Sequence, residues 1–148
     1  MRAFLALGSN LGDRRQLLRD AIASIPELRA VSAVYETPPF GPPGQGPYLN
    51  LVVELDTERS PRELLALCHE LESAAERVRI ERWGPRTLDV DIVWIEGVTV
   101  DEPDLSVPHA RAHERRFVLE PLADLAPDVA DALRGTPVDG PPVRLGPL

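Results

Sequence analysis

The chain has 148 residues, of which 43% are hydrophobic and 27% are charged, and its formal net charge at pH 7 is −8. This length and composition are typical of one globular domain, and the acidic balance argues against broad binding to nucleic acids or anionic membranes. The apolar run at the N-terminus is too short for a signal peptide, and no later run approaches the roughly 20 apolar residues of a membrane helix. We therefore expect a cytoplasmic protein.

The first half of the chain predicts a strand, a helix and two further strands. Residues 4–7 form a short apolar run that ends at Gly8, and Asp13 is the best candidate for the helix cap that follows. One face of that helix, which Pro26 ends, carries Leu17, Leu18, Ala21, Ile22 and Ile25. Residues 31–37 and 48–56 have strand patterns, and the Gly- and Pro-rich residues 40–47 between them predict a loop.

The second half begins with a helix signal at residues 60–63, where a serine cap precedes a proline and a capping-box glutamate. Apolar spacing carries this helix toward Val78, with the single cysteine, Cys68, as a predicted core residue. A strand over residues 87–95 ends at Gly97, a looser segment follows, and a last helix over residues 113–125 is bent or interrupted by Pro121.

This order predicts an α+β fold with a ferredoxin-like βαββαβ core, in which helices pack on a mainly antiparallel sheet. We expect one domain over residues 1–148, with residues 134–148 as an irregular Pro/Gly-rich tail.

Asp89 and Asp91 lie in the predicted strand over residues 87–95. Side chains alternate in a strand, so both carboxylates point to one face, roughly 7 Å apart. The opposite face is predicted to be core and carries Leu88, Val90, Ile92 and Trp94. Two carboxylates on one strand face repel each other, and a bound divalent cation would remove the repulsion. Oxygen ligands suit Mg²⁺, although a solvated edge strand with two exposed acids would have the same pattern.

Four arginines precede this acidic pair within ten positions: Arg77, Arg79, Arg82 and Arg86. Phosphoryl transfer needs the phosphates to be held in line and their charge to be neutralised, and guanidinium groups do both. The structural alternative is a solvated helix end, because positive charge is favoured at a helix C-terminus.

Residues 82–92 read Arg-Trp-Gly-Pro-Arg-Thr-Leu-Asp-Val-Asp-Ile. This string resembles the signature of the 6-hydroxymethyl-7,8-dihydropterin pyrophosphokinase family of folate biosynthesis. Four shorter motifs resemble the same family in the same order: Gly8-Ser9-Asn10-Leu11-Gly12, Tyr35-Glu36-Thr37-Pro38-Pro39, Tyr48-Leu49-Asn50 and Val107-Pro108-His109. The resemblance extends from residue 4 to about residue 127 and is highly specific because the five motifs occur together.

The resemblance implies transfer of the β,γ-pyrophosphoryl group of Mg-ATP to the hydroxymethyl oxygen of the dihydropterin, with release of AMP. We expect a monomer with no nucleic-acid or membrane partner. Two Mg²⁺ ions would be bound by Asp89 and Asp91, while Arg77 and Arg86 would stabilise the transferring group. The residues in contact with ATP would be Glu72, Arg79, Arg82, Trp83, Ile92, His109 and Arg115. The pterin would lie between the rings of Tyr48 and Phe117, surrounded by Thr37, Pro38, Phe40, Asn50 and Trp83.

Several of these residues also have a purely structural interpretation. Tyr48 and Asn50 share a strand face, so a ring and a carboxamide would converge there, yet a tyrosine in this position is also typical of half-buried packing. Phe117 has the pattern of helix core, and His109 is equally consistent with a surface residue. His69 stands where relatives can carry a glutamine that helps to hold ATP, which leaves that contact open.

Two other functions compete with the pterin pyrophosphokinase. Another Mg-dependent phosphoryl-transfer enzyme or phosphohydrolase could use the acidic pair, but it would need no pocket for a flat ring. A non-catalytic ferredoxin-like binding module would have no reason to place two acids beside four arginines.

Overall fold

The computed structural model describes residues 1–10, 12–37, 47–82 and 88–148, with the side chains of residues 77–82 excepted. Its elements follow one another as β1 (Arg2–Ser9), α1 (Arg14–Ala23), β2 (Leu28–Val31), β3 (Val34–Thr37), β4 (Tyr48–Asp56), α2 (Pro61–Arg82), β5 (Asp89–Ile95), β6 (Val100–Glu102), β7 (Leu105–Val107), the 3-10 helix η1 (Ala112–Glu114), α3 (Arg116–Leu125), α4 (Pro127–Leu133) and β8 (Val143–Gly146).

One sheet organises the described residues, in the order β5-β1-β4-β3-β8, with β2 pairing with β4 beside β3. Every pairing in this sheet is antiparallel. The arrangement confirms the predicted α+β fold with a ferredoxin-like core. β6 and β7 form a separate two-stranded hairpin.

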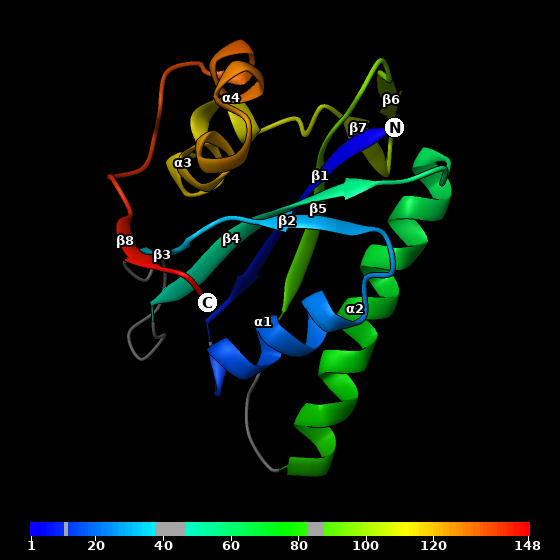
Figure 1. Ribbon diagram of the computed structural model, residues 1–148, viewed down its shortest axis with the longest axis vertical. Coiled ribbons are helices and arrows are strands. Elements are labelled where there is room, and N and C mark those ends of the chain that lie inside the picture. Colours follow the sequence, from blue (N-terminus) through cyan, green and yellow to red (C-terminus); the bar gives the residue numbers. More distant parts are fainter. Residues whose placement is uncertain (11, 38–46, 83–87) are drawn as a thin grey trace.

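Helices cover both faces of the sheet, with α1 and α2 on one side and α3 and α4 on the other (Figure 1). The larger core lies between the sheet and α1 and α2, and includes the buried side chains of Leu5, Leu18, Leu51 and Leu64. The smaller core lies between the sheet and α3 and α4, and includes Phe4, Val52, Val118 and Leu122. Burying these apolar side chains is the main favourable contribution to folding.

The predicted helix starts are confirmed by their hydrogen bonds. At the start of α1, the Asp13 carboxylate accepts the N–H of Gln16 at 3.2 Å. At the start of α2, the N–H of Ser60 donates to Glu63 Oε1 at 3.0 Å, and the N–H of Glu63 donates to Ser60 Oγ at 3.1 Å. At each of these two helix starts, a local side chain therefore accepts a backbone N–H that has no partner within the helix.

Cys68 is buried in the larger core, as predicted, and burial raises the pKa of its thiol to about 12. A thiol with this pKa stays protonated at neutral pH and is inert as a nucleophile. None of the helices in the described ranges is long and apolar enough to span a membrane.

The predicted single strand over residues 31–37 is wrong, because the chain forms two strands that both pair with β4. Ser32 lies at the break. Its N–H donates to Val52 O at 2.9 Å, its hydroxyl accepts the N–H of Val52 at 2.9 Å and donates to Ala33 O at 2.8 Å. The hydroxyl replaces a backbone partner of β4, so the strand can be interrupted without leaving a buried group unpaired.

The sequence predicts which face of the sheet each side chain of β5 points to, and this prediction is correct from Leu88 to Val93 and wrong for Trp94 and Ile95. Leu5 pairs with Ile92 and Phe4 pairs with Trp94, so Val93 is an extra residue in the ladder with β1. This bulge reverses the alternation. Trp94 therefore packs against the smaller core, while Ile95 lies in the larger one.

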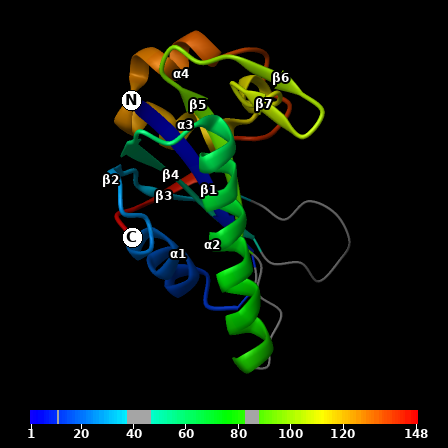
Figure 2. The same ribbon diagram turned by 90° about the vertical axis from the view of Figure 1, so that its right-hand side faces the viewer.

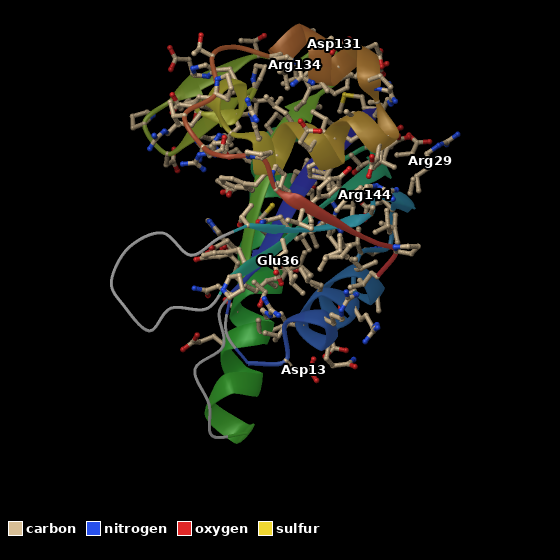
Figure 3. The ribbon with its side chains drawn as sticks, turned by 90° about the vertical axis from the view of Figure 1, so that its left-hand side faces the viewer. Asp13, Arg29, Glu36, Asp131, Arg134 and Arg144 are labelled. Carbon is tan, nitrogen blue, oxygen red and sulfur yellow. The ribbon has the colours of Figure 1, made fainter. Side chains whose placement is uncertain are left out.

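Three further differences lie in the last third of the chain. The segment predicted as loose contains the β6–β7 hairpin, and α3 continues through Pro121 without interruption. The tail is not wholly irregular, because β8 pairs with β3, with Val34 opposite Gly146. Figure 3 shows β8 between α3 and α1, and its Arg144 lies 3.9 Å from the Asp124 carboxylate of α3.

Candidate active site

The floor of the site is the sheet face that α3 partly covers. Asp89 on β5 lies opposite Gly8 on β1, and Gly8 lies opposite Asn50 on β4. Paired residues in neighbouring strands point to the same face, so the acidic edge of the sheet and the polar centre of β4 face one space. Asp91 continues the acidic edge, two residues along β5.

Gly8 lies between the acidic edge of the sheet and the polar centre of β4, and because it has no side chain, side chains of β4 can lie over β1. A Cβ atom at this position would be 2.9 Å from Asn50 Oδ1 and 3.5 Å from Tyr48 Cδ1. The Asn50 carboxamide is buried and donates from Nδ2 to Thr37 Oγ1 at 3.1 Å. Its Oδ1 therefore lies over the glycine, next to the Tyr48 ring, and only a residue without a side chain leaves room for it.

A cavity of about 570 Å³ lies above this floor, with α3 and the loop after β7 on its other side. It brings together nine of the residues predicted from the sequence: Thr37, Tyr48, Asn50, Glu72, Asp89, Asp91, His109, Arg115 and Phe117. A second cavity of about 350 Å³ shares Glu72, Asp91 and His109 with the first. Its other walls include Ile92, which was also predicted, together with His69, Asp104 and Ser106.

The carboxylate of Glu72 connects α2 to the acidic strand. Glu72 Oε2 accepts the N–H of Val90 at 3.0 Å, so it holds the outer edge of β5 between the two aspartates. Burial raises the pKa of Glu72, and the charges of Asp89 and Asp91 raise it further.

Asp89 is exposed to solvent within the concave site, yet the surrounding protein limits its hydration. This desolvation and the neighbouring Asp91 charge raise the pKa of Asp89. The acidic groups therefore repel one another in the free protein, and a cation would be favoured beside them.

His109 is fixed by two hydrogen bonds. Its backbone N–H donates to Val93 O at 2.9 Å, which attaches the loop to the outer edge of β5. Its ring Nδ1 accepts the backbone N–H of Arg111 at 3.1 Å. Burial lowers the pKa of His109, with Arg115 and Arg111 acting in the same direction and Asp91 opposing them. The neutral ring thus carries its proton on Nε2, which is a hydrogen-bond donor at the wall of both cavities.

Arg115 and Phe117 lie at the start of α3. The Arg115 guanidinium lies 5.5 Å from the centroid of the Phe117 ring. Tyr48 reaches the same cavity from the sheet, and burial followed by the Asp89 charge raises the pKa of its hydroxyl. An aromatic ring from the sheet and another from α3 therefore line one space, together with cationic and acidic groups.

Comparison with known proteins identifies the constellation. The model of the 7,8-dihydro-6-hydroxymethylpterin-pyrophosphokinase family matches residues 4–127. The chain belongs to this family. Membership confirms the predicted enzyme class, a pyrophosphokinase acting on hydroxymethyldihydropterin.

Individual relatives agree over most of their length. The chain is 47% identical to the 2-amino-4-hydroxy-6-hydroxymethyldihydropteridine pyrophosphokinase of Methylorubrum extorquens, over 86% of this chain and 84% of the relative. It is 41% identical to the protein of that name from Bacillus subtilis, over 97% and 89% respectively. The Pseudomonas aeruginosa protein of the same name is 46% identical, over 86% and 82%.

The remaining residues predicted for the pyrophosphokinase site lie where less of the structure is described. Pro38, Phe40, Trp83 and Arg86 are outside the described residues. Only the backbone of Arg77, Arg79 and Arg82 is described, in the last turns of α2, which extend beyond the end of the sheet (Figure 2).

Sequence reasoning missed three residues that shape the site. Gly8 belongs to a quoted motif, but its close approach to Asn50 depends on strand register. Arg14 Nη1 donates to Pro47 O at 2.7 Å and lies 3.6 Å from Glu36 Oε2, next to the β3–β4 ends that carry Thr37 and Tyr48. The third, Asp139, lines the larger cavity from the tail, where the sequence gives no signal.

Proposed function

We propose that this chain transfers the intact β,γ-pyrophosphoryl group of ATP to the hydroxymethyl group of 6-hydroxymethyl-7,8-dihydropterin. The hydroxymethyl oxygen forms a bond to the β-phosphorus of ATP, the bond from that phosphorus to the α-phosphate oxygen breaks, and AMP leaves while the hydroxyl proton is released. The observation that carries the proposal is the single cavity that joins Asp89 and Asp91 with the rings of Tyr48 and Phe117.

The acidic side of the cavity suits Mg²⁺. Within the described residues, no group of three or more acidic, histidine or cysteine side chains could hold a metal ion on its own. An ion at Asp89 and Asp91 would therefore take its other ligands from phosphate oxygens and water, which is the usual coordination of Mg²⁺. Burial raises the pKa values of Asp89 and Glu72, and the charges of the neighbouring aspartates add to the effect, so a cation beside these groups would be favoured. Two bound Mg²⁺ ions would neutralise the triphosphate and the attacking oxygen.

The nucleotide is assigned to the β5 edge, where the second cavity adjoins the acidic pair. Glu72 and Ile92 line this cavity, and the Nε2–H of His109 can donate to a phosphate oxygen. Arg115 supplies positive charge from the start of α3. We assign Arg77, Arg79, Arg82, Trp83 and Arg86 to the nucleotide and the transferring phosphates on the strength of their positions in the motif, and His69 becomes a candidate contact because it lines the second cavity.

The pterin is assigned to the end of the cavity between Tyr48 and Phe117. A flat heterocycle gains stacking and apolar burial between two rings. Because Asn50 already donates from Nδ2 to Thr37, its Oδ1 is the atom that can accept from the amino and ring N–H groups of a pterin. Pro38, Phe40 and Trp83 complete the proposed pterin site. A phosphohydrolase or a non-catalytic module would have no use for this combination.

The decisive assay mixes the protein with Mg-ATP and the dihydropterin alcohol and measures AMP and pterin diphosphate. We expect AMP only when the pterin is present. Asp91→Asn should remain folded and lose nearly all turnover, because it removes a metal ligand but keeps the side-chain volume. Asp131→Asn, an exposed position on α4, is the matched control and should keep full activity. Normal AMP production by folded Asp91→Asn would contradict the metal assignment, and AMP formation without pterin would contradict transfer.

A further inference from the structure

The tail between α4 and β8 is attached to η1 and to the start of α3 by hydrogen bonds. The N–H of Gly135 donates to His113 O at 2.8 Å, and the N–H of Val138 donates to Glu114 O at 3.0 Å. The approach is close, because a Cβ atom at Gly135 would lie 3.0 Å from His113 Cδ2 and 3.1 Å from His113 O. In Figure 1 this segment runs down the α3 side of the molecule.

Asp139 ends this run at the N-terminus of α3. Its Oδ1 accepts the N–H of Arg116 at 2.9 Å, and its Oδ2 accepts the N–H of Phe117 at 3.3 Å. The helix has no cap of its own, because the side chain of Arg115 at the cap position makes no capping hydrogen bond. A carboxylate from the tail, more than 20 residues further along the chain, therefore accepts two N–H groups of the first turn. Its negative charge is also favourable beside the positive end of the helix dipole.

The capped turn is part of the active-site wall. Phe117, whose N–H bonds to Asp139, lines the larger cavity, and so do Val138 and Asp139. A ring that stacks on a substrate must be held in place before binding, since disorder in the first turn of α3 would reduce the fraction of molecules ready to bind.

We propose that Asp139 is a positioning residue for the pterin: it caps α3 and thereby holds the Phe117 ring at the cavity wall across from the Tyr48 side. This inference rests on the proposed pterin site. Asp139 acts through the backbone of α3 and does not contact the reacting atoms.

The first test measures pterin affinity in the presence of Mg²⁺ and α,β-methylene-ATP. In this analogue a methylene group replaces the oxygen between the α- and β-phosphorus atoms, so that transfer cannot occur. Asp139→Ala should raise the pterin Kd about five- to tenfold, in line with the loss of a helix cap. The Kd of the nucleotide analogue should rise less than the pterin Kd, because Arg115 is its one assigned contact at the capped turn, while the other described contacts lie on α2, β5 and the loop after β7. In turnover assays the KM for pterin should rise while kcat stays similar.

Two variants separate positioning from a general loss of stability. Asp139→Asn keeps a carboxamide oxygen that can accept a helix N–H and should restore most of the affinity. Ser60→Ala removes the side-chain cap of α2 at a residue that lines neither cavity, and should lower the melting temperature without changing the pterin Kd. Asp139→Ser keeps one acceptor and should give an intermediate Kd, which provides the test if the alanine variant does not fold.

A double-mutant cycle with Phe117→Ala decides the route of the effect. If Asp139 acts through the ring, Asp139→Ala should add little to the loss caused by Phe117→Ala. Full additivity would overturn the inference, and so would an unchanged pterin Kd in Asp139→Ala while Phe117→Ala weakens binding. An unchanged Kd in Phe117→Ala would instead overturn the pterin site itself and this inference with it.

Discussion

Replacing Gly8 by alanine would test the geometry of the active-site floor with one added methyl group. The new Cβ would lie 2.9 Å from Asn50 Oδ1, about 0.5 Å closer than the 3.4 Å at which ordinary contact begins. The Tyr48 ring, at 3.5 Å, would be in normal contact. The strain therefore falls on the Asn50 carboxamide, which is buried and bonded to Thr37 and cannot move without weakening that bond.

The expected magnitude follows from these contacts. Overpacking costs about 1–3 kcal/mol, and removing a strand glycine returns about 0.5–1 kcal/mol of backbone entropy, so a net destabilisation of about 1 kcal/mol is expected. For a chain of this size, that would lower the melting temperature by about 2–4 °C. If the displaced Oδ1 loses the hydrogen bond proposed for it with the pterin, worth about 1.4 kcal/mol, the pterin Kd should rise about tenfold. The nucleotide Kd should change little.

Calorimetric titration with the dihydropterin and with α,β-methylene-ATP measures both affinities, and thermal unfolding measures the stability. Gly140→Ala is the matched control, because among the described residues no atom beyond its two chain neighbours lies within 4 Å of its added Cβ. Adding Gly8→Ala to Asn50→Ala should cause little further loss of pterin affinity, since the clash is then absent. A Gly8→Ala protein that melts at the wild-type temperature and binds pterin normally would refute the reasoning.

Other variants test single groups. Tyr48→Ala should weaken pterin binding about tenfold through lost stacking and leave the nucleotide Kd similar, and an unchanged pterin Kd would remove Tyr48 from the pocket. Arg86→Ala should lower kcat by about a hundredfold or more with little effect on pterin Kd, and the opposite pattern would argue against a catalytic role. Away from the site, Arg59 lowers the pKa of Glu27 below its ordinary value of 4.5. This pair stabilises the folded state above pH 4.5 and loses its effect as the pH falls through the folded-state pKa, so Glu27→Gln should cost about 1–2 kcal/mol at pH 7 and less at pH 3. Equal losses at both pH values would contradict the linkage.

Local signals in the sequence were sufficient to predict much of the fold. The alternation in β4 and the caps at Asp13 and Ser60 predicted these elements because the forces involved act between residues close in sequence. The facing of Asp89 and Asp91 followed from the same alternation.

The differences between the predicted and the observed fold arise from contacts between segments that are distant in sequence. Ser32 divides a strand by bonding to β4, and the bulge at Val93 is defined only by pairing with β1. Asp139 carries no recognisable cap signal because its helix begins 23 residues earlier in the chain. Strand β8 likewise depends on the free edge of β3, which a local pattern does not reveal.

The outer edge of β5 has a consequence for how variants of this enzyme should be handled. β5 is the last strand of the sheet, and an open strand edge invites pairing with another polypeptide. Here the N–H of Val90 is occupied by Glu72, and the carbonyl of Val93 is occupied by the N–H of His109. Two residues proposed to contact the nucleotide thus also occupy polar groups of this strand edge, which should limit aggregation. A Glu72→Ala protein should aggregate or precipitate more readily than wild type, so its turnover has to be measured on the fraction that elutes with wild type in size-exclusion chromatography.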